Sequence, residues 1–411
     1  MLNKFSRKLT FLAALTVIVM LGSTVATAQD EEVVYEPGDE VVVGVSLGLS
    51  GEGIAPLGID IQRGVEIANA DRPSVTVDDE EWDVVLDVQD SLCSAEGGQT
   101  VANRFTADES IVGVVGPMCS SACDAAAPIY DSADFTTISP SCTNPALSTS
   151  GYTSFNRATS TDAIQGELAA DFIYNTLGFT KIATIHDGSP YGQGLVEFVE
   201  LNFEELGGEV VASDAVTVGD TDFRSLLEDI AAEEPEVVYF GGFPAEGARL
   251  MQQLPDAGLE DVVFIGADGI QGTEVITLAG EAAEGSYASA PIPIGDDYDA
   301  FLEVYLETYN EEPPAPFHAN GYDSYNLILD AIEAVGQVDD DGNLVVSRAD
   351  IREWMRSVDG VVGLIGTYQA NGEGETLTNS GYNFFVVEDG RYVPILTVDM
   401  DEDMEEEEDE G

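Results

Sequence analysis

Apolar residues gather along the first half of the chain in short runs that alternate with segments of helix length. The β-rich runs of this first series are 41–47 (VVVGVSL), 84–88, 111–115 and 135–138. A helical repeat follows the first run and consists of Leu57, Ile61, Val65 and Ala68. The pattern predicts strands and helices in strict alternation.

A second series of the same kind begins near residue 181. Its predicted strands are 181–186, 209–213, 236–240 and 262–266. Between the first two, Leu195, Val199 and Leu206 share a helical face that ends at Gly207-Gly208, which predicts a helix C-cap there. Asp222 is predicted as the N-cap of the next helix. After residue 292 the pattern predicts two helices, 300–310 and 321–336, and a late strand, 382–389.

This alternation predicts an α/β fold with doubly wound parallel sheets that are covered on both faces. Two series in one chain of 411 residues indicate two lobes. The elements after residue 292 are too few for a third domain, so we expect them to complete the first two lobes. Loops at the carboxyl ends of the parallel strands would then face a crevice between the lobes.

The N-terminus has the pattern of a removable secretion signal. Lys4, Arg7 and Lys8 precede an apolar stretch, 11–28, that ends in Ala-Thr-Ala. A membrane anchor is the alternative, but Gly22 and its neighbours interrupt the apolar stretch before it reaches the length that a span needs. We expect residues 1–28 to be removed after Ala28, which makes the protein exported, either periplasmic or otherwise extracytoplasmic.

Composition narrows the class of partner. The chain has 78 acidic and 14 basic residues, and the net charge falls from −64 to about −67 once the signal is removed. Phosphate binding needs a basic face, so nucleic acid is excluded as a partner. The acidic stretch 398–411 is predicted to be a disordered, solvated tail.

The four cysteines could in principle serve a metal site, a redox pair, a nucleophile or disulfides. Export and an even count favour disulfides. The two histidines are remote in sequence, and Cys119 and Cys123 have CxxxC rather than CxxC spacing, which argues against zinc and thiol–disulfide exchange. The spacing does not decide which cysteines pair. It argues only against a Cys119–Cys123 bond, because two cysteines four residues apart on one helix have poor geometry for a disulfide.

Motifs for catalysis are weak. Ser46 lies in a GxSxG match, but the strand pattern continues through it and no helix follows at once, as a nucleophile elbow requires. Residues 337–348 have Gly342 at the right place for a calcium loop but lack acids at its first and last positions, so they predict a turn. His186 ends a strand and is more typical of a structural residue. We therefore predict no enzyme, no metal and no cofactor.

Five loops follow predicted strands and carry the polar residues that a binding site needs. They read GPMCSSACD (116–124), SPSCTNP (139–145), HDGSPYGQG (186–194), GGFPAEG (241–247) and GADGIQG (266–272). The first opens a helix, whose N-terminal N–H groups attract an anion. Asp268 in the last loop supplies an acid. An anion site that faces an acid across a crevice suits a zwitterion.

These loops resemble those of the periplasmic branched-chain amino acid binding proteins, the leucine/isoleucine/valine type that serves ABC importers. The similar segments are GLSGEG, GPMCSSA, ISPSCTNPAL, IHDGSPYGQG, DFRSLL, YFGGFPAEG and GADG, in the family's order between about 42 and 390. The resemblance implies the bilobal type I fold with hinge crossings near 158–161, 290–293 and 381–384. Lobe one would contain 41–160 and 292–382, and lobe two 161–291 and 383–397.

The resemblance also implies the contacts of a ligand's charged groups. Ser120 and Thr143 would hold its carboxylate from lobe one. The Cys142 carbonyl and Asp268 would hold its ammonium. Asp268 stands where this family commonly has glutamate, so its reach is shorter.

Three further positions would surround the ligand's side chain. Tyr191 and Phe243 would close over it from lobe two, and Leu57 lies near a position that is usually aromatic in the family. Phe243 lacks the hydroxyl of the usual tyrosine. These departures affect the side-chain pocket more than the zwitterion site.

The resemblance gives a disulfide pairing as well. Cys93 and Cys119 match the family's single disulfide, which leaves Cys123 to pair with Cys142. The second bridge would tie the helix behind Ser120 to the loop that carries Thr143.

The expected function is therefore that of an extracytoplasmic solute-binding protein. It would capture a small aliphatic or branched-chain amino acid by cleft closure and deliver it, as a monomer, to the membrane permease of an ABC importer. Alternatives are a ligand-sensing domain that reports to a membrane receptor, or a binder of an amide or a small carboxylate. A hydrolase is the remaining possibility.

Overall fold

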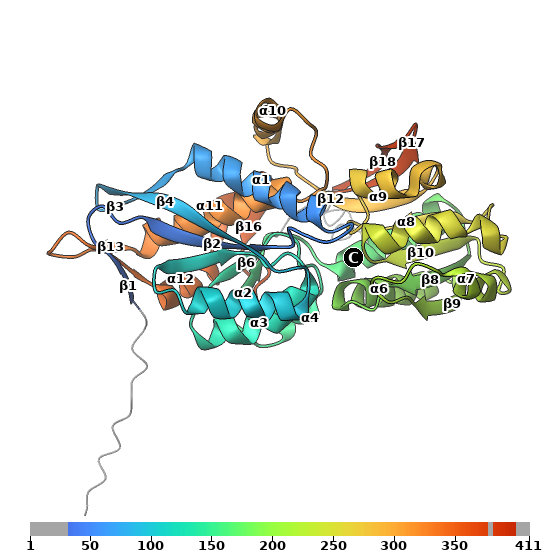
Figure 1. Cartoon of the computed structure of the whole chain (residues 1–411), viewed down its shortest axis with the longest axis horizontal. Helices are drawn as coiled ribbons and strands as arrows, with labels where there is room; N and C mark the ends of the chain where they lie inside the picture. The colour runs from blue at the N-terminus through green and yellow to red at the C-terminus, as the bar shows by residue number, and fades with distance from the viewer. Residues whose placement is uncertain (1–31, 377–380, 400–411) are drawn as a thin grey trace, which may run out of the picture.

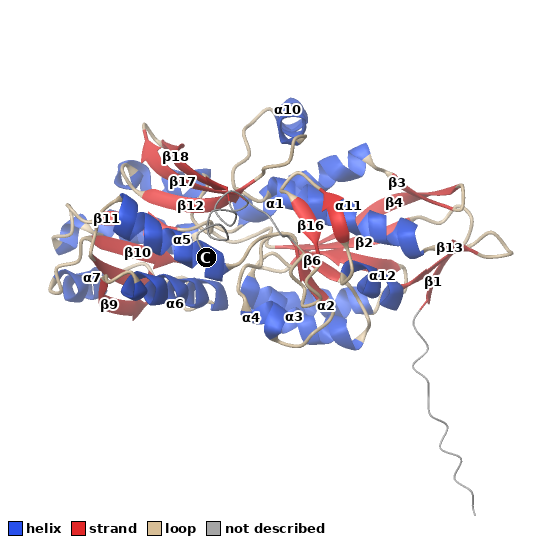
Figure 2. Ribbon diagram, turned by 180° about the vertical axis from the view of Figure 1, so that it is seen from behind, coloured by secondary structure: helices blue, strands red, loops and turns tan. Residues whose placement is uncertain are grey.

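The computed structural model describes residues 32–376 and 381–399. The predicted signal, with its cleavage after Ala28, and nearly all of the predicted acidic tail lie outside the described residues. Two α/β lobes stand side by side along the long axis of the molecule (Figure 1). The predicted fold class is confirmed by sheets that are mainly parallel and carry helices on both faces (Figure 2).

The sheet of the first lobe consists of strands β2 Val41–Leu47, β3 Ser74–Val77, β4 Glu80–Asp90, β5 Ile111–Val115, β6 Thr137–Ser139 and β7 Phe155–Arg157. Within the described residues these strands have the order β3-β4-β2-β5-β6-β7. All are parallel except β3, which pairs with β4 in antiparallel fashion. The apolar run of β2 is almost wholly buried, as expected for a parallel strand that is covered on both faces.

The sheet of the second lobe consists of strands β8 Lys181–His186, β9 Glu209–Ala215, β10 Val237–Gly241, β11 Val263–Gly266, β12 Tyr287–Ile292, β17 Gly381–Glu388 and β18 Arg391–Asp399. Their order in the described part of the chain is β18-β17-β12-β11-β10-β8-β9. The late strands β17 and β18 are antiparallel to their neighbours. Because β18 reaches Asp399, the strand overlaps the first residues of the predicted tail.

Helices pack on both faces of each sheet. In the first lobe they are α1 Ala55–Asp71, α2 Ala95–Thr106, α3 Ser120–Ser132, α4 Ala146–Thr149, α10 Tyr298–Tyr309, α11 His318–Val335 and α12 Arg348–Met355. In the second lobe they are α5 Asp162–Asp171, the π-helical turn Phe172–Thr176, α6 Pro190–Glu205, α7 Arg224–Ala231, α8 Pro244–Gln253, α9 Thr273–Ala279 and the 3-10 turns Pro255–Ala257 and Gly280–Ala283.

The core of the first lobe depends on a close helix pair. Helices α1 and α11 lie on one side of its sheet, and α2 and α3 lie on the other (Figure 1). A Cβ atom at Gly64 of α1 would come within 1.8 Å of the His318 carbonyl oxygen, so only glycine allows this approach. Leu57, Ile61 and Val65 of the predicted helical face are buried in the same core.

Short strands complete the periphery. Strands β1 Glu32–Tyr35, β13 Gln337–Val338 and β14 Leu344–Ser347 form a small antiparallel sheet, and β15 Asp359–Val362 pairs with β16 Thr367–Gln369. The stretch that resembled a calcium loop forms β13, β14 and the turn between them, where the Asp339 carboxylate accepts a hydrogen bond from the Asn343 N–H at 2.9 Å. The prediction of a turn there is confirmed.

The chain changes lobes three times along its length. It leaves the first sheet after β7, returns after β12 and reaches the second sheet again at β17. The predicted crossings near 158–161, 290–293 and 381–384 fall at or beside these points. The exact residue boundaries of the lobes stay a prediction.

Two predicted helix ends have different outcomes. Helix α6 ends at Glu205, and Gly207 has the positive φ of 97° that suits glycine after a helix, so that prediction is confirmed. The predicted N-cap at Asp222 is wrong, because helix α7 begins at Arg224 with Phe223 in the capping position. The Asp222 carboxylate instead pairs with the Arg224 guanidinium at 2.6 Å.

Candidate ligand-binding site

A pocket lies between the two lobes, where the loops at the carboxyl ends of the parallel strands meet. Its lining residues are Leu57, Ile61, Met118, Cys119, Ser120, Ser141, Tyr191, Phe243, Asp268, Gly269 and Phe317. They come from both lobes, and five of the seven predicted ligand-binding residues are among them. These five are Leu57, Ser120, Tyr191, Phe243 and Asp268. Strand-end loops that are far apart in the sequence therefore meet at one place.

The lobes are in contact around this pocket. The Asn144 side-chain amide of the first lobe donates a hydrogen bond to the Pro190 carbonyl of the second at 2.5 Å. At the other rim, a Cβ atom on Gly53 would come within 2.8 Å of the Ala245 nitrogen. Contacts on both rims define a closed arrangement of the lobes.

Capping residues place the two aromatic side chains that line the pocket from the second lobe. The Ser189 hydroxyl accepts a hydrogen bond from the Gly192 N–H at 3.0 Å and starts helix α6, so Tyr191 lies in its first turn. Phe243 precedes the proline that begins α8. The two rings lie 5.5 Å apart between centroids. Together with Leu57 they give the pocket an apolar wall.

Asp268 is the acid of the pocket. It follows β11 and is 3% exposed, and its carboxylate accepts a hydrogen bond from the Tyr191 hydroxyl at 3.0 Å. The same hydroxyl accepts a hydrogen bond from the Gly269 N–H at 3.0 Å, which fixes its orientation. Burial raises the pKa of Asp268 to about 6, although the hydrogen bond from Tyr191 lowers it. A nearby cation would favour the charged carboxylate.

Ser120 marks the opposite, electropositive side of the pocket. It is the first residue of α3 and 2% exposed. The first N–H groups of a helix have no intrahelical acceptor, so this end can bind an anion. The Ser120 hydroxyl accepts a hydrogen bond from the Asn144 N–H at 3.4 Å. An acid and a helix N-terminus thus lie in one small pocket.

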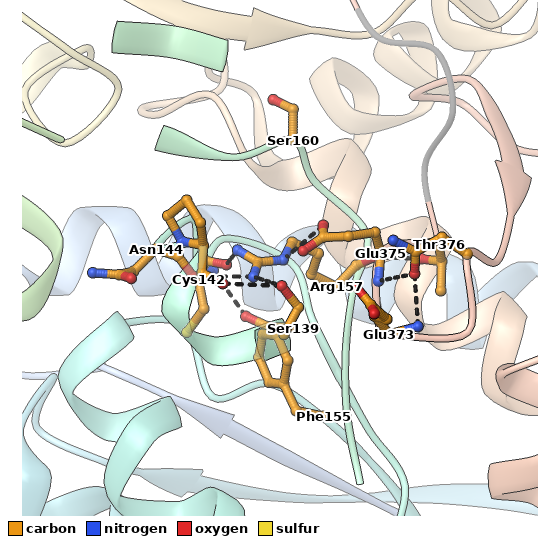
Figure 3. Close-up of polar contacts among 12 residues, drawn as sticks. Ser139, Cys142, Asn144, Phe155, Arg157, Ser160, Glu373, Glu375 and Thr376 are labelled. Carbon is orange, nitrogen blue, oxygen red and sulfur yellow. Dashed lines mark hydrogen bonds and ion pairs between the residues drawn. The ribbon is translucent and has the colours of Figure 1, made fainter. Parts of the chain in front are cut away.

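Cys142 and Thr143 are placed differently from the other predicted site residues. Neither belongs to the described lining of the pocket, and both are buried. The Cys142 carbonyl accepts a hydrogen bond from the Arg157 guanidinium at 2.7 Å (Figure 3). Ser141 lines the pocket instead. The contact between the Cys142 carbonyl and a ligand ammonium stays a prediction. The bond from Arg157 already uses one lone pair of that carbonyl oxygen.

The two disulfides support the loops of the first lobe. Cys93 bonds to Cys119 and Cys123 bonds to Cys142, with Cα–Cα distances of 5.3 Å and 6.7 Å. The predicted pairing is confirmed. The first bond fixes the residue before Ser120, and the second ties α3 to the neighbouring loop.

Residues that carried the weaker catalytic hypotheses lie outside this pocket. Ser46 is buried within β2, so the GxSxG match is a strand, as predicted. The His186 ring at the end of β8 accepts a hydrogen bond from the Gly188 N–H at 3.1 Å, which is a structural role. Among the described residues, no group of three or more His, Cys, Asp and Glu side chains could hold a metal ion. No helix in the described ranges is long and apolar enough to cross a membrane.

Sequence reasoning missed several lining residues. Ser141 adjoins a predicted position, and Met118 lies within a predicted loop. Ile61 belongs to the helical repeat, where its spacing predicted only burial. Phe317 lies between the two helices predicted after residue 292, in a segment that was assigned to lobe one but to no binding loop.

Comparison with known proteins agrees with this geometry. Residues 40–391 match the family described as periplasmic binding protein. A leucine-, isoleucine-, valine-, threonine- and alanine-binding protein of Pseudomonas aeruginosa is 31% identical over 254 residues, or 61% of this chain and 67% of the relative. A Leu/Ile/Val-binding protein homolog of Brucella abortus is 31% identical over 302 residues, or 73% of this chain and 80% of the relative.

Solved structures give the same result for the fold. The crystal structure of a leucine binding protein, LivK, from Thermotoga maritima has a TM-score of 0.78 and 27% sequence identity, and the match covers 88% of this chain and 99% of that one. Two α/β lobes that meet around a closed pocket define a two-lobed binding protein. The chain belongs to the periplasmic binding protein family, as the resemblance of its loops predicted.

Proposed function

We propose that the protein binds a small aliphatic amino acid of the branched-chain type outside the cytoplasm and delivers it to the permease of an ABC importer. One observation carries this proposal. A buried carboxylate, Asp268, and the N-terminus of α3 line one small pocket with apolar walls. The names of the relatives, which are leucine, isoleucine and valine binders, support the same choice of ligand.

Each group of such a ligand has a partner of matching chemistry. The ammonium would bind Asp268, whose buried carboxylate otherwise lacks a cation in the pocket lining. The carboxylate would bind the N–H groups at the start of α3 and the Ser120 hydroxyl. The aliphatic side chain would contact Leu57 and Phe243, where its burial contributes about 25 cal/mol per Å² of apolar area.

Cleft closure would couple binding to delivery. The ligand contacts residues of both lobes, so it stabilises the closed arrangement by its differential contacts with the two states. Contacts between the lobes, such as that of Asn144 with Pro190, would then form together with the ligand. A permease could distinguish the loaded from the empty protein by this shape.

The remaining parts of the proposal concern the protein's export, its oligomeric state and the absence of catalysis. The family supports export, and we propose removal of the signal after Ala28, action as a monomer and no enzymatic step. A ligand-sensing domain or a binder of an amide or small carboxylate would use the same fold. Ligand preference separates these alternatives.

Titration calorimetry with the twenty amino acids tests the proposal. Leucine, isoleucine and valine should bind, and the deaminated acids should not, because they lack the group that Asp268 holds. Asp268→Ala should weaken leucine binding a few hundred- to a few thousand-fold, since breaking a buried charge pair costs about 3–5 kcal/mol.

Two further variants serve as controls for that experiment. Ser120→Ala should weaken binding less, because the N–H groups of α3 remain. Asp323→Ala removes a buried carboxylate of the first lobe that lies outside the pocket lining and accepts from the Leu364 and Ile365 N–H groups, and it should leave the affinity unchanged. If no amino acid binds, or if Asp268→Ala binds as tightly as the wild type, the proposal is wrong.

A further inference from the structure

Asp162 is a buried acid that the site described above does not use. It is the first residue of α5, directly after the chain's first crossing between the lobes, and it is 0% exposed. Neither oxygen of its carboxylate makes a hydrogen bond of good geometry among the described residues, and the Thr143 hydroxyl is the one side-chain donor near it there. Buried carboxylates are normally paired because removal from water strongly disfavours a bare charge.

The charged groups around Asp162 do not balance it. Burial raises the pKa of Asp162 well above its usual range, and the charge of Asp268 raises it further, whereas the Thr143 hydroxyl and Arg157 lower it. Arg157, however, donates to the Cys142 carbonyl and forms an ion pair with Glu375 at 3.1 Å (Figure 3). The nearest cation is therefore committed to other partners.

Asp162 and Asp268 lie close to the same three buried tyrosines. Burial raises the pKa values of Tyr191 and Tyr239 well above their usual range, and the charges of both aspartates raise them further. The pKa of Tyr382 is raised in the same way, although its hydroxyl also bonds Ser160. Each tyrosine thus lies within the fields of both carboxylates.

Several polar atoms near Asp162 also have unused hydrogen-bonding capacity. The Gln165 carbonyl oxygen and the Tyr239 hydroxyl are buried and have no hydrogen-bond partner within the described ranges, and the Thr143 hydroxyl has no partner there other than Asp162. The Asp162 N–H donates to the Thr143 carbonyl at 3.0 Å, which ties Asp162 to a loop of the ligand pocket. Among the described residues this region has two hydroxyls, a free acceptor and two carboxylates, and its one cation, Arg157, is bound elsewhere.

We propose that Asp162 is a second carboxylate for the amino group of the bound molecule, acting together with Asp268. This inference rests on the proposed function, because it requires a ligand with an ammonium group. An ammonium has three N–H donors. One would serve Asp268, one would serve Asp162 directly or through the Thr143 hydroxyl, and one would serve a carbonyl of the neighbouring loop.

The two carboxylates also explain how the empty protein tolerates so much buried negative charge. Two acids in one buried site do not both ionise readily, so the pair holds a proton when no cation is present. The arriving ammonium takes the place of that proton, which leaves to solvent. Binding should therefore release protons near pH 6, where Asp268 titrates.

Titration calorimetry of leucine near pH 6, in two buffers with different ionisation enthalpies, measures this release directly. The wild type should release up to about one proton per leucine bound. Asp162→Asn keeps the shape and removes the charge, and it should weaken binding roughly 10- to 100-fold and lower the proton count. Asp323→Asn, a control at a buried acid of the first lobe outside the pocket lining, should change neither quantity.

The outcomes separate this inference from the proposed function. If the wild type binds leucine but Asp162→Asn binds as tightly and releases the same number of protons, Asp162 does not contact the amino group and the inference is wrong. If Asp162→Asn does not fold, the Asp268→Asn variant provides the test. It keeps Asp162, so its weaker binding of leucine must still release protons from Asp162. Release that disappears in Asp268→Asn overturns the inference, and a wild type that binds no amino acid overturns both proposals.

Discussion

Replacement of Arg157 by methionine tests how the loop beside the pocket is held. The Arg157 side chain is fully buried and donates to the carbonyls of Cys142 at 2.7 Å and Asn144 at 3.0 Å. Its Nε lies 3.1 Å from a Glu375 carboxylate oxygen (Figure 3). Methionine keeps most of the volume but leaves two carbonyls and one carboxylate without their donor.

The loss of stability follows from these contacts. Removing one partner of a buried ion pair costs about 3–5 kcal/mol. The Glu375 side chain is 25% exposed, so water can rehydrate its carboxylate, and the lower end of that range applies. We therefore expect Arg157→Met to lower the free energy of unfolding by about 3 kcal/mol. The loop would also be less well ordered, so leucine affinity should fall.

Urea unfolding at constant high salt, followed by tryptophan fluorescence, measures the first effect. Glu375→Gln is the matched control, because it removes the charge but leaves the contacts of Arg157 with the carbonyls. It should cost less than Arg157→Met, because the guanidinium keeps its carbonyl acceptors and the new amide oxygen can still accept from Nε. An Arg157→Met protein that unfolds within about 1 kcal/mol of the wild type would refute the reasoning, as would equal losses in the two variants.

Three further outcomes are expected. Non-reduced peptide mapping of the purified protein should find Cys93–Cys119 and Cys123–Cys142, and free thiols or crossed pairs would contradict the structure. The net charge is −64 before signal removal, and salt screens repulsion within about 8–10 Å at ordinary ionic strength. The thermal midpoint of the protein should therefore rise clearly between dilute buffer and molar salt. A flat response would reject that explanation. Since folding raises the pKa of Asp268 from 3.8 to about 6, the folded state binds that proton more tightly than the unfolded chain does. The empty protein should lose about 3 kcal/mol of stability as pH rises from about 4 through 6, and Asp268→Asn should lessen this loss when unfolding is measured at both ends of the range.

Long apolar runs made the sheets predictable. Residues 41–47 and 111–115 form strands with the predicted bounds, because a strand that is buried on both faces must be apolar throughout. Strand β7 has only three residues and gives no such signal. It was therefore missed, together with Arg157 at its end and Asp162 soon after it.

The candidate site was predictable only in part for a related reason. Loops that follow parallel strands lie at one edge of each sheet, and the crevice expected between the two lobes brings these edges, with Ser120 and Asp268, to the same pocket. Which backbone carbonyl faces the pocket depends on the contacts of a loop, and no residue type reports it. The Cys142 carbonyl accepts from the guanidinium of Arg157 on the neighbouring strand β7, and because β7 was not predicted, this contact could not be foreseen.

A crystal structure with bound leucine would test the proposed binding mode most directly. We expect the amino group within hydrogen-bonding distance of the Asp268 carboxylate, the ligand carboxylate at the start of α3 beside Ser120, and the isobutyl group against Leu57 and Phe243. Leucine bound in the opposite orientation, with its carboxylate toward Asp268, or bound outside the pocket between the lobes, would contradict this binding mode.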